Sequence, residues 1–91
     1  MQPSANNVDA FPLGRAPRGF VGIIDRIAAN GANSALEHDE LESRLLELGF
    51  VDGAPVEILH EGLIGGDPIA VRVQGITIAL RRLEAMAVLV R

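Results

Sequence analysis

The sequence has no cysteine, lysine, tryptophan or tyrosine, and each absence removes a class of chemistry from this chain of 91 residues. Without cysteine, disulfide scaffolds, zinc ribbons and thiol nucleophiles are excluded. The only aromatic side chains are Phe11, Phe20 and Phe50, so a sheet that stacks single-stranded nucleic acid bases is not expected. All eight basic residues are Arg and the net charge is −4, which argues against nucleic acid as a partner.

Export signals and long apolar runs are missing too. Residues 1–8 contain neither the basic region nor the apolar region of a signal peptide. The longest strongly apolar stretch, residues 85–90, is far shorter than the ~20 residues that span a bilayer. We therefore expect a cytoplasmic protein without direct membrane insertion. The length predicts one domain with a small core, in which the polar residues 1–10 form a mobile tail and residues 11–91 fold.

An apolar stripe at helical spacing predicts one helix, formed by Leu41, Leu45 and Leu48. Gly49 stands where a glycine in the left-handed conformation ends a helix. Two capping boxes compete for the start, one at residues 34–37 and one at residues 39–42. The second fits the stripe better, so we expect the helix over residues 39–48.

Alternating apolar residues on both sides of Gln74-Gly75 predict a β-hairpin over residues 69–80 with a two-residue turn. Its cross-strand pairs would be Ile69–Leu80, Ala70–Ala79, Val71–Ile78, Arg72–Thr77 and Val73–Ile76. This register places every Ile, Val and Leu of the hairpin on one buried face, and a slip of one residue would destroy that agreement.

Further strands are predicted at residues 20–28, 55–60 and 87–90, with a helical turn at residues 83–86. Residues 61–68 contain three Gly and one Pro, which is typical of a loop. Five short strands and one helix inserted after the first strand predict a mainly β fold. With an interior of Val, Ile and Leu, it would be a small SH3-like barrel.

These residues also carry a family resemblance. Residues 44–59 read RLLELGFVDGAPVEIL, and residues 66–90 read GDPIAVRVQGITIALRRLEAMAVLV. Three landmarks occur in order: an RL-x-ELG helix end, a GDP-I-x-V-x-V-x-G-x-x-I-ALR hairpin and an EA-x-A-[VI]-L-V terminus. With this ordered set the chain resembles the FeoA family from residue 11 to residue 90. It departs from that family in a longer connection over residues 28–35 and in Asp52, where Pro is common.

The resemblance implies a small accessory protein of ferrous iron uptake that acts by contact with the cytoplasmic part of the FeoB membrane transporter. It implies no enzymatic activity of the chain itself. Family members also resemble the SH3-like domain of metal-dependent repressors, so an accessory domain of a metal-responsive transcription regulator is the alternative. No helix-turn-helix fits a chain dominated by strands, and the acidic centre disfavours an RNA-binding barrel.

Metal ligands are scarce, although ferrous sites favour several nitrogen and oxygen ligands. The two histidines are His38 and His60. His60 and Glu61 are adjacent at a strand end, where side chains diverge, and His38 shares a helix face with Glu42 only if the helix begins early. We therefore predict no intrinsic iron site and no cofactor.

Catalytic motifs are missing as well. The serines lack a G-x-S-x-G context, and the acids of residues 37–42 are typical of a helix start. The glycines of residues 62–66 lack the Gly-Lys-Ser/Thr element of a phosphate loop.

Charge is distributed unevenly along the chain. Residues 34–67 hold nine acids and one Arg for a net charge of −8, whereas residues 68–91 hold four Arg and one Glu for a net charge of +3. Such patches would steer a complementary partner, or they would only solubilise a small domain.

Apolar residues in predicted loops are the better interface candidates. Leu63 and Ile64 stand in the glycine-rich loop, and Phe50 and Val51 follow the helix end. Exposed, they would suit docking of a partner helix or peptide. The alternative is that they fold inward over the barrel, which we favour for Phe50 and leave open for Leu63 and Ile64. Exposed sheet edges would also allow a weak homo-oligomer.

Overall fold

The computed structural model describes residues 9–28 and 35–91, except for the side chains of residues 35–38. The tail predicted over residues 1–10 therefore lies outside the described residues up to residue 8. In chain order the elements are β1 (Phe11–Pro12), the 3₁₀ turn η1 (Leu13–Arg15), β2 (Val21–Ile27), α1 (Ala35–Glu47), β3 (Pro55–Ile64), β4 (Asp67–Val73), β5 (Ile76–Leu80), α2 (Arg82–Ala85) and β6 (Val88–Val90).

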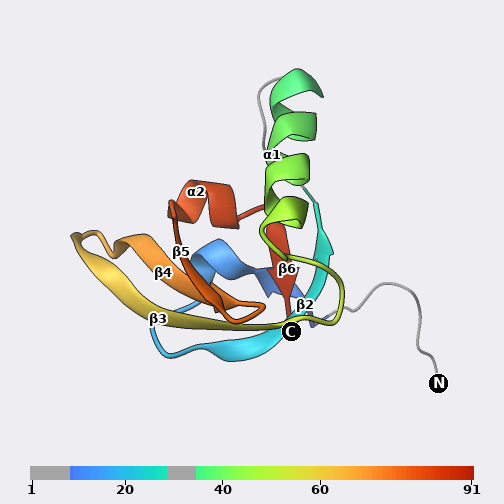
Figure 1. Ribbon diagram of the computed structural model, residues 1–91. Coiled ribbons are helices and arrows are strands. Elements are labelled where there is room, and N and C mark those ends of the chain that lie inside the picture. The colour runs from blue at the N-terminus through green and yellow to red at the C-terminus, as the bar shows by residue number, and fades with distance from the viewer. Residues whose placement is uncertain (1–8, 29–34) are drawn as a thin grey trace.

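The strands form one antiparallel sheet in the order β1-β6-β2-β3-β4-β5, which curls into a small barrel (Figure 1). Strand β2 joins the two halves because it changes partner along its length. Its first residues, Val21 to Ile23, pair with β3. The rest, from Ile24 on, pairs with β6, with a register shift between Ile24 and Arg26. The predicted mainly β, SH3-like architecture is confirmed. The short strand β1 is an addition to the predicted strands.

The hairpin of β4 and β5 has the predicted register, from Ile69 opposite Leu80 to Val73 opposite Ile76. Gln74 and Gly75 form its turn with φ values of 51° and 80°, as a two-residue turn requires. One expectation about its buried face is wrong. Ile76 is 47% exposed, because the turn carries it past the edge of the core.

Helix α1 begins at Ala35 rather than at the predicted residue 39. The extra turn consists of Ala, Leu, Glu and His, and three of these four residue types have high helix propensity. The end of the helix is confirmed at Gly49, whose φ is 105°. The Gly49 N–H donates to the carbonyl of Leu46 and the Phe50 N–H donates to the carbonyl of Leu45, which together form a Schellman motif.

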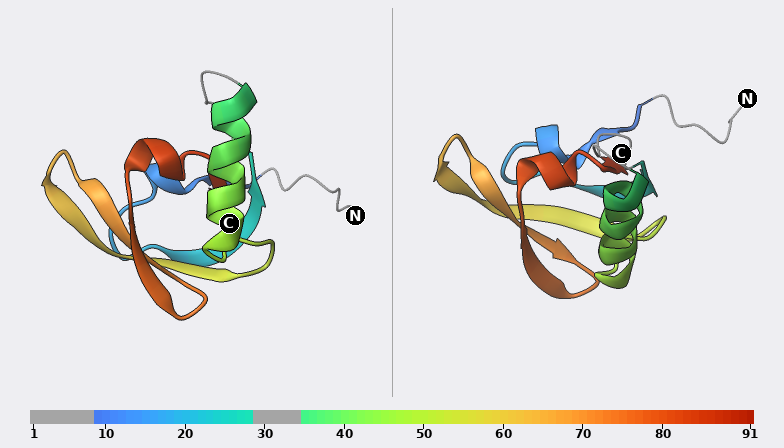
Figure 2. Two further views of the ribbon diagram at one scale, coloured as in Figure 1. Left: turned by 45° about the horizontal axis from the view of Figure 1, so that its top comes forward. Right: turned by 90° about the horizontal axis from the view of Figure 1, so that it is seen from above.

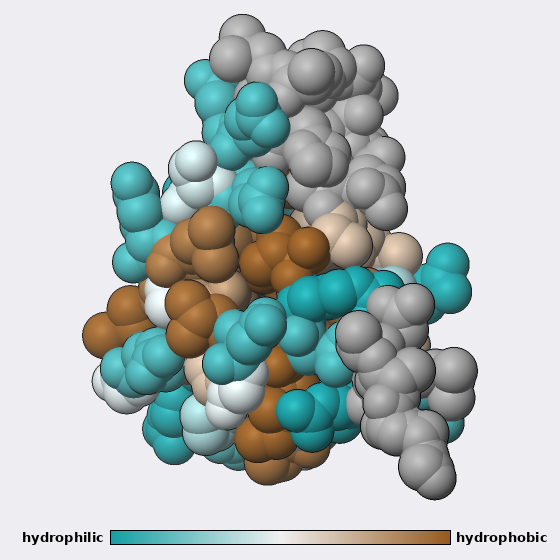
Figure 3. Space-filling view, turned by 90° about the vertical axis from the view of Figure 1, so that its right-hand side faces the viewer, coloured by the Kyte–Doolittle hydropathy of each residue, from teal (hydrophilic) through white to brown (hydrophobic). Residues whose placement is uncertain are grey.

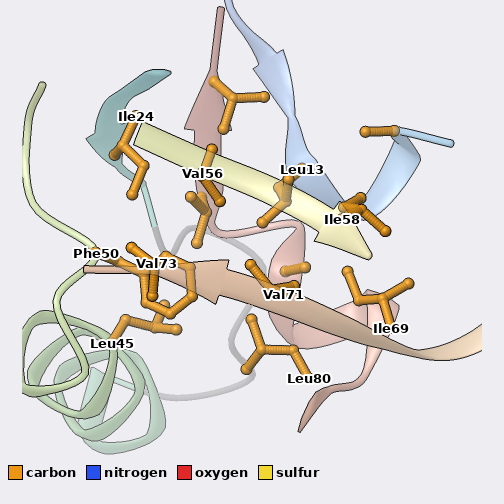
Figure 4. Close-up of a cluster of buried hydrophobic side chains, with 14 of the residues drawn as sticks. Leu13, Ile24, Leu45, Phe50, Val56, Ile58, Ile69, Val71, Val73 and Leu80 are labelled. Carbon is orange, nitrogen blue, oxygen red and sulfur yellow. The ribbon is translucent and has the colours of Figure 1, made fainter. Parts of the chain in front are cut away.

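Buried aliphatic side chains from both halves of the sheet, from η1 and from α1 form one core (Figure 4). Leu45 and Phe50 close one end of it, and both have 0% exposure. Among the described residues, no polar or charged side chain is buried. Phe50 lies inside the core, so its prediction as a surface contact is wrong. The alternative favoured from the sequence, an inward position, is confirmed. The cause is the Schellman motif, which brings the residue after Gly49 back onto Leu45.

Strand β3 continues to Ile64, well beyond its predicted end at residue 60, and the loop predicted over residues 61–68 is mostly strand. The β3–β4 hairpin therefore extends from the barrel as a wing, at the left of Figure 1. Figure 2 shows the wing and α1 projecting from the barrel at separate places. Neither α-helix of the described chain is long and apolar enough to cross a bilayer.

Candidate protein-interaction site

The wing tip, defined here as residues 61–67, carries two adjacent apolar side chains in water. Leu63 is 103% exposed and Ile64 is 88% exposed. Gly65 and Gly66 make the turn with φ values of 68° and 71°, which an L side chain adopts only with strain. In a regular strand the side chains of Leu63 and Ile64 would lie on opposite faces. Both are exposed here because the hairpin reaches beyond the core on either face.

Gly62 lets the two strands of the wing approach closely. A Cβ atom at Gly62 would lie 2.0 Å from the carbonyl oxygen of Asp67, which is far inside van der Waals contact. The pairing is irregular at this point, with a register shift between Glu61 and Ile64. Gly62, which suggested a loop in the sequence, therefore permits the close approach of two paired strands.

Arg82, the first residue of α2, fixes the wing tip to the body of the protein. Its Nε donates to the carbonyl oxygen of Gly66 at 2.7 Å, and its Nη2 donates to Oε1 of Glu61 at 2.8 Å. Its Nη1 donates to the carbonyl oxygens of Gly14 at 3.0 Å and Ala16 at 2.8 Å, around the 3₁₀ turn η1. A planar guanidinium suits such a fan of acceptors, so Arg82 holds the tip in one position.

The backbone of Arg82 adds a further link, because its N–H donates to Oδ1 of Asp67 at 2.8 Å. The charged groups at the base of the tip are therefore already engaged within the protein. Glu61 pairs with the guanidinium and Asp67 caps the start of α2. The side chains of the tip that stand furthest in water are therefore the apolar ones, Leu63 and Ile64.

Helix α2 is in turn fixed to α1 by an ion pair between Arg44 and Glu84. Burial alone would raise the pKa of Glu84. The Arg81 backbone N–H, which donates to Oε1 at 3.0 Å, and the Arg44 guanidinium outweigh it and lower the pKa below the usual value of 4.5. The ion pair thus links α1 to α2, whose first residue holds the wing tip.

A shallow hollow of about 340 Å³ lies between the ends of β4 and β5 and the helix α2. Its lining residues are Asp67, Pro68, Ala79, Leu80, Arg81 and Glu84. Asp67, which pairs with Ile64 in the hairpin, is the one lining residue that belongs to the wing tip.

Val51, the fourth predicted interface residue, is 39% exposed in the turn after α1 and is not part of the wing tip. Figure 3 shows apolar surface broken by hydrophilic side chains on the side of the molecule that lies at the right of Figure 1. Scattered apolar residues of this kind are common on monomers. The structure separates Val51 from Leu63 and Ile64, so the predicted candidates do not form one patch.

The sequence predicts few metal ligands, and of the two histidines the structure describes the side chain of His60. His60 is exposed, and Glu61 beside it is engaged by Arg82. The early start of α1 puts residues 38 and 42 one turn apart, but the side chain of His38 lies outside the described residues. Within residues 9–28 and 39–91, no three His, Asp or Glu side chains gather closely enough to hold a metal ion.

The FeoA domain model matches residues 11–91, almost the whole chain. This chain belongs to the FeoA family. The FeoA protein of Stenotrophomonas maltophilia, whose crystal structure contains zinc, is 34% identical, with a TM-score of 0.72 over 90% of this chain and 91% of that one. It is described as a prokaryotic SH3 domain protein and a suggested activating factor of bacterial ferrous iron transport. No curated protein sequence matches the chain.

Two further structures place the FeoA fold in context. The FeoA protein of Chlorobium tepidum is 29% identical, with a TM-score of 0.70 over 88% of this chain and 68% of that one. A manganese-dependent transcriptional repressor is 20% identical, with a TM-score of 0.71, and this chain covers only 42% of it. The likeness to the repressor therefore concerns the fold alone. Zinc is a feature of the Stenotrophomonas structure.

Proposed function

We propose that this FeoA domain is a non-enzymatic accessory module of ferrous iron uptake that binds the cytoplasmic part of a FeoB-type membrane transporter. The wing tip supports this proposal most directly. Two fully exposed apolar side chains at the end of a hairpin are unfavourable in water, and a hydrophobic partner surface would bury them. Family membership supplies the association with ferrous iron transport.

The gain from docking follows from the size of these side chains. Full burial of a Leu or Ile side chain contributes about 1.5–3 kcal/mol, so Leu63 and Ile64 together would contribute about 3–6 kcal/mol. Binding normally loses part of such a gain to the ordering of mobile groups. The hydrogen bonds of Arg82 to Gly66 and Glu61 hold the tip in advance, which reduces that loss.

A retention assay tests the proposal. The transporter's cytoplasmic part, immobilised, should retain the wild-type chain and should not retain the Leu63→Asp/Ile64→Asp double variant. Val21→Asp is the matched control, because Val21 is also exposed, at 68%, but lies opposite Glu57 on the barrel, about 20 Å along β3 from the tip. Retention of the double variant at the wild-type level would contradict the assignment to the wing tip. No retention of the wild type would contradict the proposed function.

A further inference from the structure

Strand β5 ends the sheet and offers an open edge. It pairs with β4 on one side, and no described backbone group bonds to its other side (Figure 2). Natural edge strands are usually protected by charged residues, proline or bulges. The residues of β5 are Ile, Thr, Ile, Ala and Leu, without charge, proline or a register shift. Within β5 itself none of these three protections is present, although the strand has only five residues.

The hairpin register shows which backbone groups face outward. A two-residue turn makes Val73 and Ile76 a hydrogen-bonded pair, and such pairs alternate along an antiparallel ladder. The N–H and C=O groups of Ile76, Ile78 and Leu80 therefore face β4. Those of Thr77 and Ala79 face the open edge, where a further strand could bond to them.

The apolar face of β5 is also incompletely covered along this edge. Ile76 is 47% exposed and Ile78 is only partly buried against the core. A strand added beside them would cover both side chains with its own apolar residues at alternate positions.

A positive charge stands at the end of the same edge. Arg81 follows β5 and lines the hollow. Its charge helps to lower the pKa of Glu84 in the same hollow, but its guanidinium forms no ion pair within 4.0 Å with any described residue. The two acids of the hollow have other contacts, since Asp67 accepts the Arg82 N–H and Glu84 pairs with Arg44. The hollow thus offers Arg81 to a carboxylate on an incoming chain.

We propose that the open edge of β5 is a strand-addition site for an extended segment of the transporter's cytoplasmic part, with apolar residues at alternate positions and a carboxylate that pairs with Arg81. This inference rests on the proposed function and names a second contact on the same partner. The hollow lies between the end of β5 and Asp67, which pairs with Ile64 at the base of the wing tip, so the two surfaces are close enough for one partner.

A second copy of this chain fits the edge less well. Pairing of two β5 strands about a two-fold axis at Ile78 would put Thr77 opposite Ala79 of the second copy. It would also put Arg81 opposite Gly75 of the second copy, which has no charge to offer. Such a pair would leave the hollow and its guanidinium without a partner.

Amide hydrogen exchange of the full chain tests the site, with and without the purified cytoplasmic part of the transporter. In the free protein the amides of Ile76 and Ile78 should be protected, whereas those of Thr77 and Ala79 should exchange fast. Addition of the transporter should slow exchange at Thr77 and Ala79 by about tenfold or more. Binding without this slowing would overturn strand addition and leave the proposed function standing. No binding at all would overturn both, and slowing that depends only on the concentration of the chain itself would assign the edge to a second copy.

Three variants complete the test. Thr77→Pro removes one outward N–H and no bond to β4, and it should weaken binding by about fivefold to tenfold, as expected for the loss of one hydrogen bond. Thr77→Ala is the matched control, because it keeps the N–H and should bind like the wild type. Arg81→Gln should weaken binding by a similar factor and should reduce its dependence on salt. If Thr77→Pro folds, by its urea midpoint, and binds like Thr77→Ala, strand addition is wrong.

Discussion

Replacing Arg82 by Met tests the fixation of the wing most severely. The substitution keeps an unbranched side chain of similar reach and removes the guanidinium. It thereby deletes the bonds to three carbonyl oxygens, those of Gly14, Ala16 and Gly66, and the bond to Glu61. Residues 14 and 16 are buried, so their carbonyl groups have poor access to water as a substitute.

The magnitude follows from these bonds. A hydrogen bond to a charged group contributes about 1.5–3 kcal/mol, but the Arg82 side chain is 21% exposed, so water can replace part of the set. We therefore expect the free energy of unfolding to fall by about 2–4 kcal/mol. A domain of this size has a total of about 5–14 kcal/mol, so the loss should be a large fraction of it.

Equilibrium unfolding in urea measures the effect. With an m value of about 2 kcal/mol/M, the midpoint should fall by about 1–2 M. Arg82→Lys should lie between wild type and Arg82→Met, because an ammonium group cannot reach the same fan of acceptors. The matched control is Arg72→Met, whose side chain is 56% exposed and whose ion pair with Glu57 spans 3.7 Å; its effect should be below about 0.5 kcal/mol. Equal losses for Arg82→Met and Arg72→Met would refute the reasoning.

Three other substitutions test the core, the helix pair and the turn. Phe50→Ala should lower the free energy of unfolding by about 3–5 kcal/mol, whereas Val51→Ala, at an exposed neighbour, should change it by less than about 0.5 kcal/mol; similar effects would contradict the burial of Phe50. Because the folded-state pKa of Glu84 is lowered, its stabilisation is present above the unfolded pKa and is lost as the pH falls through the folded pKa. The stability difference between wild type and Glu84→Gln should therefore shrink as urea unfolding is repeated below pH 4.5, and a difference independent of pH would contradict the role of Arg44. Gln74→Asn, at a φ of 51°, should raise the thermal midpoint by a few degrees, about 0.5 kcal/mol, and a lower midpoint would contradict the assigned turn.

The sequence predicted best what local periodicity determines. The β4–β5 hairpin followed from alternation on both sides of Gln74-Gly75, because only one register puts every large apolar residue on one face. The end of α1 followed from Gly49 for an equally local reason. The start of α1 did not, since two capping boxes begin within two turns of each other and propensity allows both.

The wing was missed because its residues carry the composition of a loop. Glycine at residues 62, 65 and 66 usually breaks a strand, but Gly62 here permits a close approach to Asp67. Only the partner strand shows that β3 continues to Ile64. The sequence also carries a local signal for the inward position of Phe50, because the apolar residue after a C-terminal glycine commonly packs against the last turn of the helix.

The role of Arg82 could not be derived from the sequence. Arg81 and Arg82 are adjacent and chemically identical, and nothing local distinguishes them. In the structure the Arg82 guanidinium bonds to the carbonyl oxygens of Gly14, Ala16 and Gly66, whereas Arg81 lines the hollow. Contacts between segments so distant in the chain depend on how the sheet closes, which no short pattern encodes.

Calorimetric titration of the transporter's cytoplasmic part with the wild-type chain and with Leu63→Asp/Ile64→Asp tests the central claim most directly. Burial of Leu63 and Ile64 should contribute about 3–6 kcal/mol to the binding free energy. The double variant should therefore bind more than about 100-fold more weakly than the wild type, with an unchanged urea midpoint. A dissociation constant within about twofold of the wild-type value would contradict the claim that the wing tip carries the interaction.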